Sequence, residues 1–154
     1  MNDRNLPILL SESVRRYGLD PSDIKIEITE SMLAQDFATA TEILDTIREH
    51  GFRIALDDFG TGYSNFAYIK RFPITTVKID RSFVVELGED KSGIALIRGI
   101  VALAKSLDLS VIVEGVETEQ QREALRTTGC DTIQGYLVGR PCPAEDFFRM
   151  VCTS

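Results

Sequence analysis

The stretch RIALDDFGTGYS, residues 53–64, runs from a short aliphatic segment into two aspartates and a glycine-containing loop. Such an aliphatic segment is typical of a strand buried on both faces of a parallel sheet, where an unpaired charge is costly. Four more polar residues lie within or directly after similar segments, at Glu27, Lys78, Glu114 and Gln134. Because the polar residues stand near the carboxyl ends of successive segments, the pattern indicates a functional site at one end of a sheet.

The charges at these positions favour a cation site. Counting Glu27, Asp57, Asp58 and Glu114 against Lys78 leaves a formal excess of three negative charges. Divalent cations would neutralise it, and two metals roughly 3.5–4 Å apart can generate a nucleophile and stabilise phosphoryl oxygens in phosphodiester hydrolysis. Lys78 then has a separate role, since a lysine among carboxylates can hold a hydroxide and offset charge in the transition state.

The composition limits the possible partners. With 154 residues, of which 44% are hydrophobic, the chain is long enough for one core and too short for two ordinary domains. The net charge of −7 leaves no basic surface for a nucleic acid backbone, which argues against polymeric DNA or RNA. A small phosphate-bearing ligand stays compatible with this charge, because metal ions can supply the positive charge that the side chains lack.

The cysteines and the first residues indicate where the protein resides. Cys130, Cys142 and Cys152 show no paired spacing, so we expect reduced thiols in a cytosolic protein. The start, MNDRNLPILLSES, has only a short apolar stretch and does not fit a signal peptide or a membrane span. We therefore expect a cytoplasmic chain, with room for it to be part of a larger, membrane-attached protein.

Strand-like and helix-like segments alternate along the chain. Strands are predicted at 24–29, 53–57, 76–80, 110–116 and 132–137, and helices at 37–50, 64–71, 91–107, 119–127 and after Pro143. This alternation favours right-handed crossovers and a parallel sheet. A doubly wound sheet would often carry a glycine-rich phosphate loop after its first strand, which this chain lacks. The prediction is therefore an α/β fold, a partial TIM-type (β/α) barrel with about five parallel strands and its N-terminal strands missing.

Five motifs carry a family resemblance. EITES at 27–31, DDFGTGYS at 57–64, KIDRSFV at 78–84, EGVET at 114–118 and QGYLVGRPCP at 134–143 resemble, in order and spacing, the EAL domain family of bacterial cyclic di-GMP phosphodiesterases. The resemblance is clear over about 17–154, so residues 1–154 are expected to form a truncated EAL-like domain. It implies a TIM-like barrel that hydrolyses cyclic di-GMP to linear pGpG with Mg²⁺ or Mn²⁺.

The resemblance also implies roles for individual residues. Glu27 and Asp57 resemble metal ligands, Asp57 bridging two metals, and Asp58 resembles a ligand of the second metal. Lys78 resembles the residue that orients the attacking water, and Glu114 and Gln134 resemble further members of the metal and water network. Residues that resemble the supporting parts or the substrate loop are Glu30, Phe59, Gly60, Thr61, Gly62, Tyr63, Ser64, Glu117, Arg140 and Pro141.

Several alternatives stay open at this point. No Glu-Ala-Leu signature precedes these motifs, and the family's upstream asparagine is absent, so a catalytically inactive cyclic di-GMP sensor or a protein-interaction module is the second hypothesis. An unrelated metal-dependent barrel enzyme, such as one of the enolase type, is the third. Lys78 could instead pair with Asp80 at a strand end, and Thr118 could be a simple helix cap. EITES could also be a helix start, with Thr29 or Ser31 as its cap. The two edge strands of an open barrel predict a homo-oligomer, or pairing with the missing N-terminal part of the domain.

Overall fold

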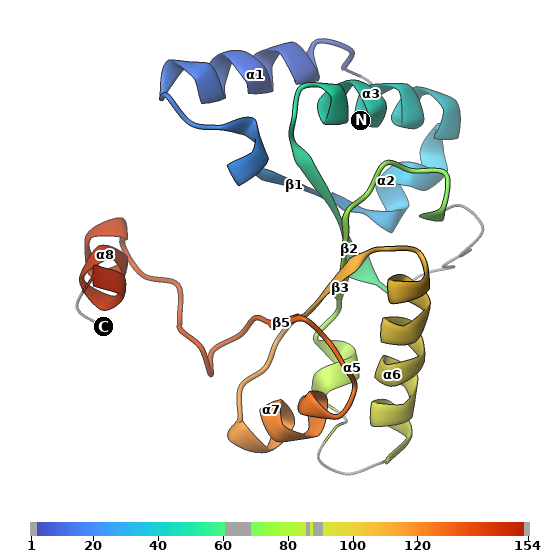
Figure 1. The fold of residues 1–154 in the computed structure, drawn as a ribbon, viewed down its shortest axis with the longest axis vertical. Helices are drawn as coiled ribbons and strands as arrows, with labels where there is room; N and C mark the ends of the chain where they lie inside the picture. The colour runs from blue at the N-terminus through green and yellow to red at the C-terminus, as the bar shows by residue number, and fades with distance from the viewer. Residues whose placement is uncertain (1–2, 61–68, 86, 88–90, 153–154) are drawn as a thin grey trace.

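The computed structural model describes residues 3–60, 69–85, 87 and 91–152. Its centre is a sheet of five parallel strands in the order β1-β2-β3-β4-β5 (Figure 1). The strands are β1 (Lys25–Thr29), β2 (Arg53–Phe59), β3 (Thr76–Ile79), β4 (Ser110–Val113) and β5 (Thr132–Ile133). The spatial order follows the sequence without reversal, as it does in a barrel and as it does not in a doubly wound sheet. The predicted partial (β/α) barrel is confirmed.

Helices follow the strands as the alternation predicted. They are α1 (Leu6–Arg16), the 3₁₀ turn η1 (Pro21–Asp23), α2 (Glu30–Gln35), α3 (Phe37–Glu49), α5 (Ser82–Val85), α6 (Lys91–Ser106), α7 (Glu119–Arg126) and α8 (Ala144–Cys152). The predictions for α3, α6, α7 and α8 are correct to within about one residue. The sequence reasoning missed α1 and α5, whereas the alternative of a helix start within EITES agrees with α2, which has Thr29 at its N-cap position but no side-chain cap bond. Most of the predicted helix at 64–71 lies outside the described residues.

The last two strands end earlier than predicted. Instead of reaching residues 116 and 137, β4 ends at Val113 and β5 at Ile133. In β4 the cause is Gly115, whose φ of 72° turns the backbone out of the sheet after Glu114. After β5, Gly135 lies so close to the backbone of Val116 that a Cβ would overlap it. Each strand therefore delivers one polar residue to the sheet end and then turns away.

The core lies between the sheet and the helices that cover it. The apolar stripe on α3, formed by Ile43, Leu44 and Ile47, is buried and packs toward β2. On α6, Ile97, Ile100, Val101 and Ala104 are buried toward β4. Burying one aliphatic side chain of this kind stabilises the fold by about 1.5–3 kcal/mol. These contacts fix the strands, and so they fix the residues at the strand ends.

Among the described residues, the two outer strands each leave one edge unpaired, and the last helix is largely exposed. Within the described residues, β1 pairs only with β2, and β5 pairs only with β4. Helix α8 stands apart from the sheet at the end of an extended segment (Figure 1), and Phe147, Phe148, Met150 and Val151 are more than half exposed. No helix among the described residues is long and apolar enough to cross a membrane.

Candidate functional site

Lys78 is the centre of the site. It lies on the middle strand, β3, and its side chain is only 4% exposed. Its ammonium Nζ lies 2.7 Å from Glu27 Oε2, 3.0 Å from Asp57 Oδ1 and 2.9 Å from Glu114 Oε1. The three carboxylates come from β1, from β2 and from the end of β4. The structure therefore brings residues from four strands together around one cation.

The alternative pairing of Lys78 with Asp80 is wrong. The Asp80 carboxylate accepts a hydrogen bond from the backbone N–H of Ser82 at 2.9 Å, and so it caps the start of α5. Hydrogen bonding to the side chain of Ser82, with a smaller effect of this backbone bond, lowers the pKa of Asp80 from its ordinary value. Thr118 does cap α7, since its hydroxyl accepts from the N–H of Gln121 in a full capping box. The cap fixes the end of the loop that begins at Glu114.

The pKa values of Lys78 and Glu114 show how burial and ion pairing compete. Burial alone would lower the pKa of Lys78, but the close carboxylates of Glu27, Glu114 and Asp57 together outweigh it and raise the pKa above the ordinary value. Burial raises the pKa of Glu114, and the nearby charges of Asp57 and Glu27 add to this, while Lys78 opposes it. The lysine is therefore held in its charged form, whereas Glu114 lies in an environment with excess negative charge.

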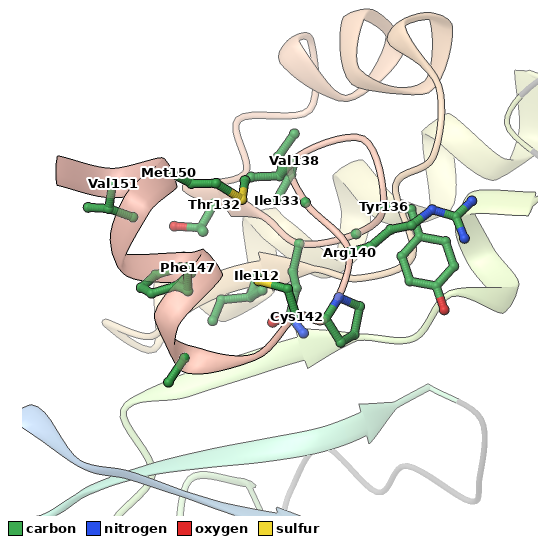
Figure 2. A pocket seen from close by; sticks show the side chains of 15 residues that line it. Ile112, Thr132, Ile133, Tyr136, Val138, Arg140, Cys142, Phe147, Met150 and Val151 are labelled. Carbon is green, nitrogen blue, oxygen red and sulfur yellow. The ribbon is translucent and has the colours of Figure 1, made fainter. Parts of the chain in front are cut away.

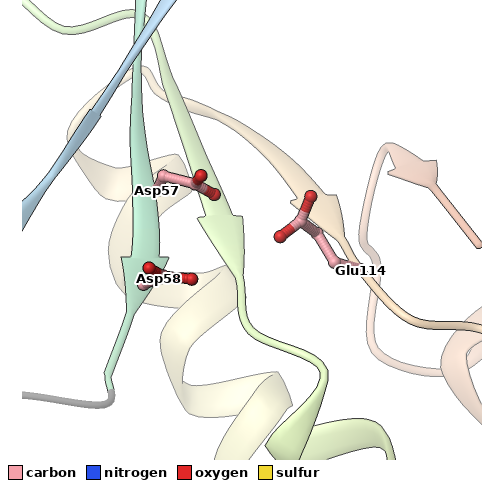
Figure 3. A group of neighbouring side chains, drawn as sticks. All are labelled: Asp57, Asp58 and Glu114. Carbon is pink, nitrogen blue, oxygen red and sulfur yellow. The ribbon is translucent and has the colours of Figure 1, made fainter.

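Asp57, Asp58 and Glu114 form a group that can hold a cation. One carboxylate oxygen from each of them lies within 4.8 Å of the others (Figure 3). Successive side chains of a regular strand point to opposite faces. Here the register of β2 shifts between Leu56 and Phe59, and Asp58 has a φ of 54°, so both aspartates can face Glu114. The irregular strand end creates the convergence.

One oxygen atom of Asp57 is better suited to coordinating a metal ion than to its present surroundings. Asp57 Oδ1 is buried and, within the part of the chain that the structure describes, accepts no hydrogen bond in good geometry. It lies 3.0 Å from Lys78 Nζ, so it is close to positive charge without being a properly directed acceptor. A buried carboxylate oxygen of this kind is costly unless it is paired or coordinates a cation. The donor set, three carboxylates, suits a hard divalent ion.

Glu30 supports the loop that follows β2. Its carboxylate Oε1 accepts a hydrogen bond from the backbone N–H of Gly60 at 3.2 Å. Phe59, which precedes Gly60, is 2% exposed and belongs to the core. The remaining residues of this predicted substrate loop, Thr61, Gly62, Tyr63 and Ser64, lie outside the described residues. The start of the loop is thus anchored to the core by Phe59 and to α2 by Glu30.

Gln134, Arg140 and Pro141 lie elsewhere. They line a hollow of about 1000 Å³ between β5 and α8 (Figure 2), and Lys78 and its carboxylates are not among its lining residues. The guanidinium of Arg140 stacks over the Tyr136 ring at 4.6 Å from the centroid. The structure therefore places these three residues beside the hollow and not among the ion pairs of Lys78.

Two further features were missed by the sequence reasoning. Glu117 forms an ion pair of 2.8 Å with Arg81, a residue that lies within a recognised motif but received no role. The second feature is the close packing of the two loops after β4 and β5. The sequence held a signal for it, because a glycine directly follows both Glu114 and Gln134. In addition, the tripeptide Glu-Ala-Leu does occur at 123–125, but it lies in α7, where Glu123 pairs with Arg126 on the surface and Leu125 is core.

Comparison with known proteins gives a consistent result. The model of the EAL domain family matches residues 1–141. The bifunctional diguanylate cyclase/cyclic di-GMP phosphodiesterase MucR of Pseudomonas aeruginosa is 44% identical over 146 residues, covering 92% of this chain and 21% of that protein. The chain spans about a fifth of the length of the curated relatives that it matches most strongly.

Solved structures extend the likeness to the fold. The PaMucR phosphodiesterase in complex with c-di-GMP matches with a TM-score of 0.87 and 43% identity, over 93% of this chain and 58% of that one. Klebsiella pneumoniae BlrP1, solved with manganese and cyclic di-GMP, matches with a TM-score of 0.82 and 32% identity, over 87% of this chain and 34% of that one. These matches rule out the unrelated barrel enzyme as an interpretation.

Proposed function

The chain belongs to the EAL domain family, and from this premise we propose that its site takes part in the metal-dependent hydrolysis of cyclic di-GMP to linear pGpG. The observation that carries the proposal is the convergence of Asp57, Asp58 and Glu114, each of which offers an oxygen within 4.8 Å of the others. Asp57 Oδ1 adds to this, since it is buried and has no directed donor among the described residues. The cyclic di-GMP phosphodiesterase activity of MucR and the ligands of the two solved complexes support cyclic di-GMP as the ligand and the use of divalent ions.

In this proposal the carboxylates hold Mg²⁺ or Mn²⁺. Asp57, Asp58 and Glu114 would be its ligands, with Glu27 at the edge of the same group. The ion, when bound, would polarise the phosphoryl oxygens and generate the nucleophile from water. Glu30 and Phe59 would hold the loop after β2 in place beside the metal ligands.

Lys78 would act as a fixed positive charge and hydrogen-bond donor. Its raised pKa keeps the ammonium protonated at neutral pH, so it does not serve as a general base. It lies 3.0 Å from Asp57 and 2.9 Å from Glu114, so its positive charge would be close to water or a phosphoryl oxygen held at the metal ligands. A preorganised donor of this kind typically contributes about 10²–10³-fold to the rate.

A second candidate is a protein that binds cyclic di-GMP without hydrolysing it. The sequence observation in its favour is that the only Glu-Ala-Leu tripeptide, at 123–125, lies in a surface helix and not at a strand end. A site with fewer carboxylates at its rim would attract metal ions less strongly while leaving the substrate loop and the hollow beside α8 in place. Such a protein would be a sensor or an interaction module.

The experiment that tests the proposal uses a chimeric protein. The chain replaces the matching part of the PaMucR phosphodiesterase, and pGpG formation and cyclic di-GMP binding are measured with Mg²⁺ or Mn²⁺. Hydrolysis that falls by about 100-fold or more in a Lys78→Ala version, with binding retained, supports the proposal. Binding without product in the parent hybrid supports the sensor. A folded hybrid that does neither contradicts both.

A further inference from the structure

The loop that begins at Glu114 is held to the loop after β3. The backbone N–H of Glu114 donates to the carbonyl of Ile79 at 3.0 Å, so Glu114 itself still belongs to the ladder between β4 and β3. The chain then turns at Gly115, and the N–H of Val116 donates to the carbonyl of Gln134 at 3.1 Å. The direction in which the Glu114 side chain leaves the sheet therefore depends on what fixes residues 115–117.

Arg81 covers this turn. A Cβ on Gly115 would lie less than 3.0 Å from three side-chain carbons of Arg81, so the arginine stem packs directly over the residue that follows Glu114. Its guanidinium then reaches Glu117 Oε1 at 2.8 Å. Arg81 lies three residues after Lys78 in the chain. One side chain thus connects the segment that carries Lys78 to the segment that carries Glu114.

Gln121 holds the same loop from its other end. Its side-chain Oε1 accepts from the backbone N–H groups of Glu117 at 2.8 Å and of Thr118 at 3.0 Å. Its Nε2 donates to the carbonyl of Val84 in α5 at 3.4 Å. Since α5 follows Arg81 directly, both connections join the same two loops. This arrangement is more than an isolated surface ion pair.

We propose that Arg81 is a positioning residue that, through Gly115 and Glu117, holds the Glu114 carboxylate against Lys78 and toward Asp57. The 2.9 Å contact between Lys78 and Glu114 and the grouping of Glu114 with the aspartates are the two geometric results of this clamp. The consequence for metal affinity rests on the proposed function. The consequence for the Lys78–Glu114 contact is independent of that function.

An ordinary ion pair would behave differently. The side chains of Arg81 and Glu117 are 57% and 37% exposed, and pairs with this exposure contribute little to stability. Loss of an outer partner that orients a metal ligand, in contrast, typically lowers metal affinity by about 10–100-fold. A positioning role therefore predicts a change at Lys78 and at the metal, with little change in melting temperature.

The test compares Arg81→Ala with Arg122→Ala. Arg122 is a matched control, since it is 49% exposed and pairs with Glu119 on α7. The first readout is the nitrogen NMR signal of the Lys78 ammonium in the metal-free chain, which is sharp only while the group is buried and fully paired. The second is Mn²⁺ affinity by calorimetry. We expect Arg81→Ala to broaden the signal and to weaken Mn²⁺ binding by about tenfold, with Arg81→Lys intermediate.

Each outcome decides one of the two proposals. If Arg81→Ala keeps a sharp Lys78 signal and the parent Mn²⁺ affinity, as Arg122→Ala should, the positioning role is wrong. If the parent chain binds no Mn²⁺, the proposed function fails, and the NMR comparison still decides the role of Arg81. Should Arg81→Ala fold poorly, Glu117→Gln removes the charge of the same pair while keeping the size of the side chain. An unchanged Lys78 signal in that variant would also overturn the clamp.

Discussion

Replacing Lys78 by methionine should destabilise the metal-free chain and make its folding depend on divalent ions. The methionine fills the buried space of the lysine stem but leaves three carboxylates without their common cation. A divalent ion can take over that role, because Asp57 and Glu114 also belong to the group of carboxylates that includes Asp58. The variant therefore separates the charge of Lys78 from its volume.

The magnitude follows from the exposure of the partners. Removing one partner of a buried ion pair costs about 3–5 kcal/mol. Lys78 is 4% exposed, but Glu114 and Asp57 are 18% and 23% exposed and Glu27 is 47% exposed, so water partly solvates the orphaned carboxylates. We therefore expect a loss of about 2–3 kcal/mol, or roughly 5–10 °C in melting temperature for a chain of this size.

Thermal unfolding followed by circular dichroism, at neutral pH with EDTA or with excess Mn²⁺, measures both effects. Mn²⁺ at about 100 times its dissociation constant should return about 2.7 kcal/mol, so the variant should gain more from the metal than the parent does. Lys105→Met is the control, because Lys105 is 47% exposed and pairs with Asp131 alone at 3.3 Å. It should lose less than about 1 kcal/mol and show no special response to Mn²⁺.

Two results would refute this reasoning. A Lys78→Met chain that melts in EDTA at the parent temperature would show that the carboxylates do not need the ammonium. A variant that is destabilised but gains no more from Mn²⁺ than the parent would show that Lys78 and the metal do not share ligands.

Three further outcomes are expected. Asp57→Asn should weaken Mn²⁺ binding by about tenfold or more in calorimetry, since it removes a charged ligand, and equal affinity would contradict the assignment. Asp131 accepts the N–H of Val111 at 3.0 Å and pairs with Lys105, which lowers its pKa below 3.8. The stabilising effect of the Asp131 carboxylate is therefore full above that value and is lost as the pH falls through the lower folded pKa. The parent should be more stable than Asp131→Asn by less than about 1 kcal/mol, because the group is 43% exposed. The resulting difference in melting temperature should close between pH 5 and acid pH. The chain should also self-associate through the open sides of β1 and β5, and a compact monomer in sedimentation at micromolar concentration that binds no hydrophobic dye would contradict this.

The sequence predicted the sheet and the Lys78 cluster because both follow from one pattern. A polar residue after an aliphatic run marks a strand end, and parallel strands place those ends at one edge of the sheet. Glu27, Asp57, Lys78 and Glu114 meet there for this reason. The roles of these residues as ligand or catalyst are a separate matter, and they stay predictions until metal binding and turnover are measured.

Helix α1 was missed although its signal was visible. Leu6, Leu10 and Val14 repeat every four residues, and all three pack against the core. The segment was weighed only as a signal peptide or membrane span, for which it is too short. The helices α2 and α5 are different, since six and four residues are too few to show a helical period. Their positions follow from the loops that they close.

The meeting of Asp57 with Asp58 could not be read from the sequence. Adjacent residues of a strand normally point apart, and only the register shift and the positive φ of Asp58 bring both carboxylates to one side. Gln134 shows the opposite case. The predicted strand 132–137 includes it, but β5 ends one residue before it, and the next residue, Gly135, packs against Val116. Gln134 is among the residues that line the hollow beside α8.

The charge balance of the site connects its stability to its chemistry. Lys78 offsets one of the four negative charges of Glu27, Asp57, Asp58 and Glu114, which leaves a formal excess of three. Burial is the main cause of the raised pKa of Glu114, and the charges of Asp57 and Glu27 add to it. A divalent ion would remove that excess, but it must bind two carboxylates that already pair with Lys78. If the ion takes the oxygens that now lie against Lys78, its binding would loosen the lysine from Asp57 and Glu114 and free N–H donors for water or a phosphoryl oxygen. The same exchange of partners that costs the metal some affinity would prepare Lys78 for its part in hydrolysis.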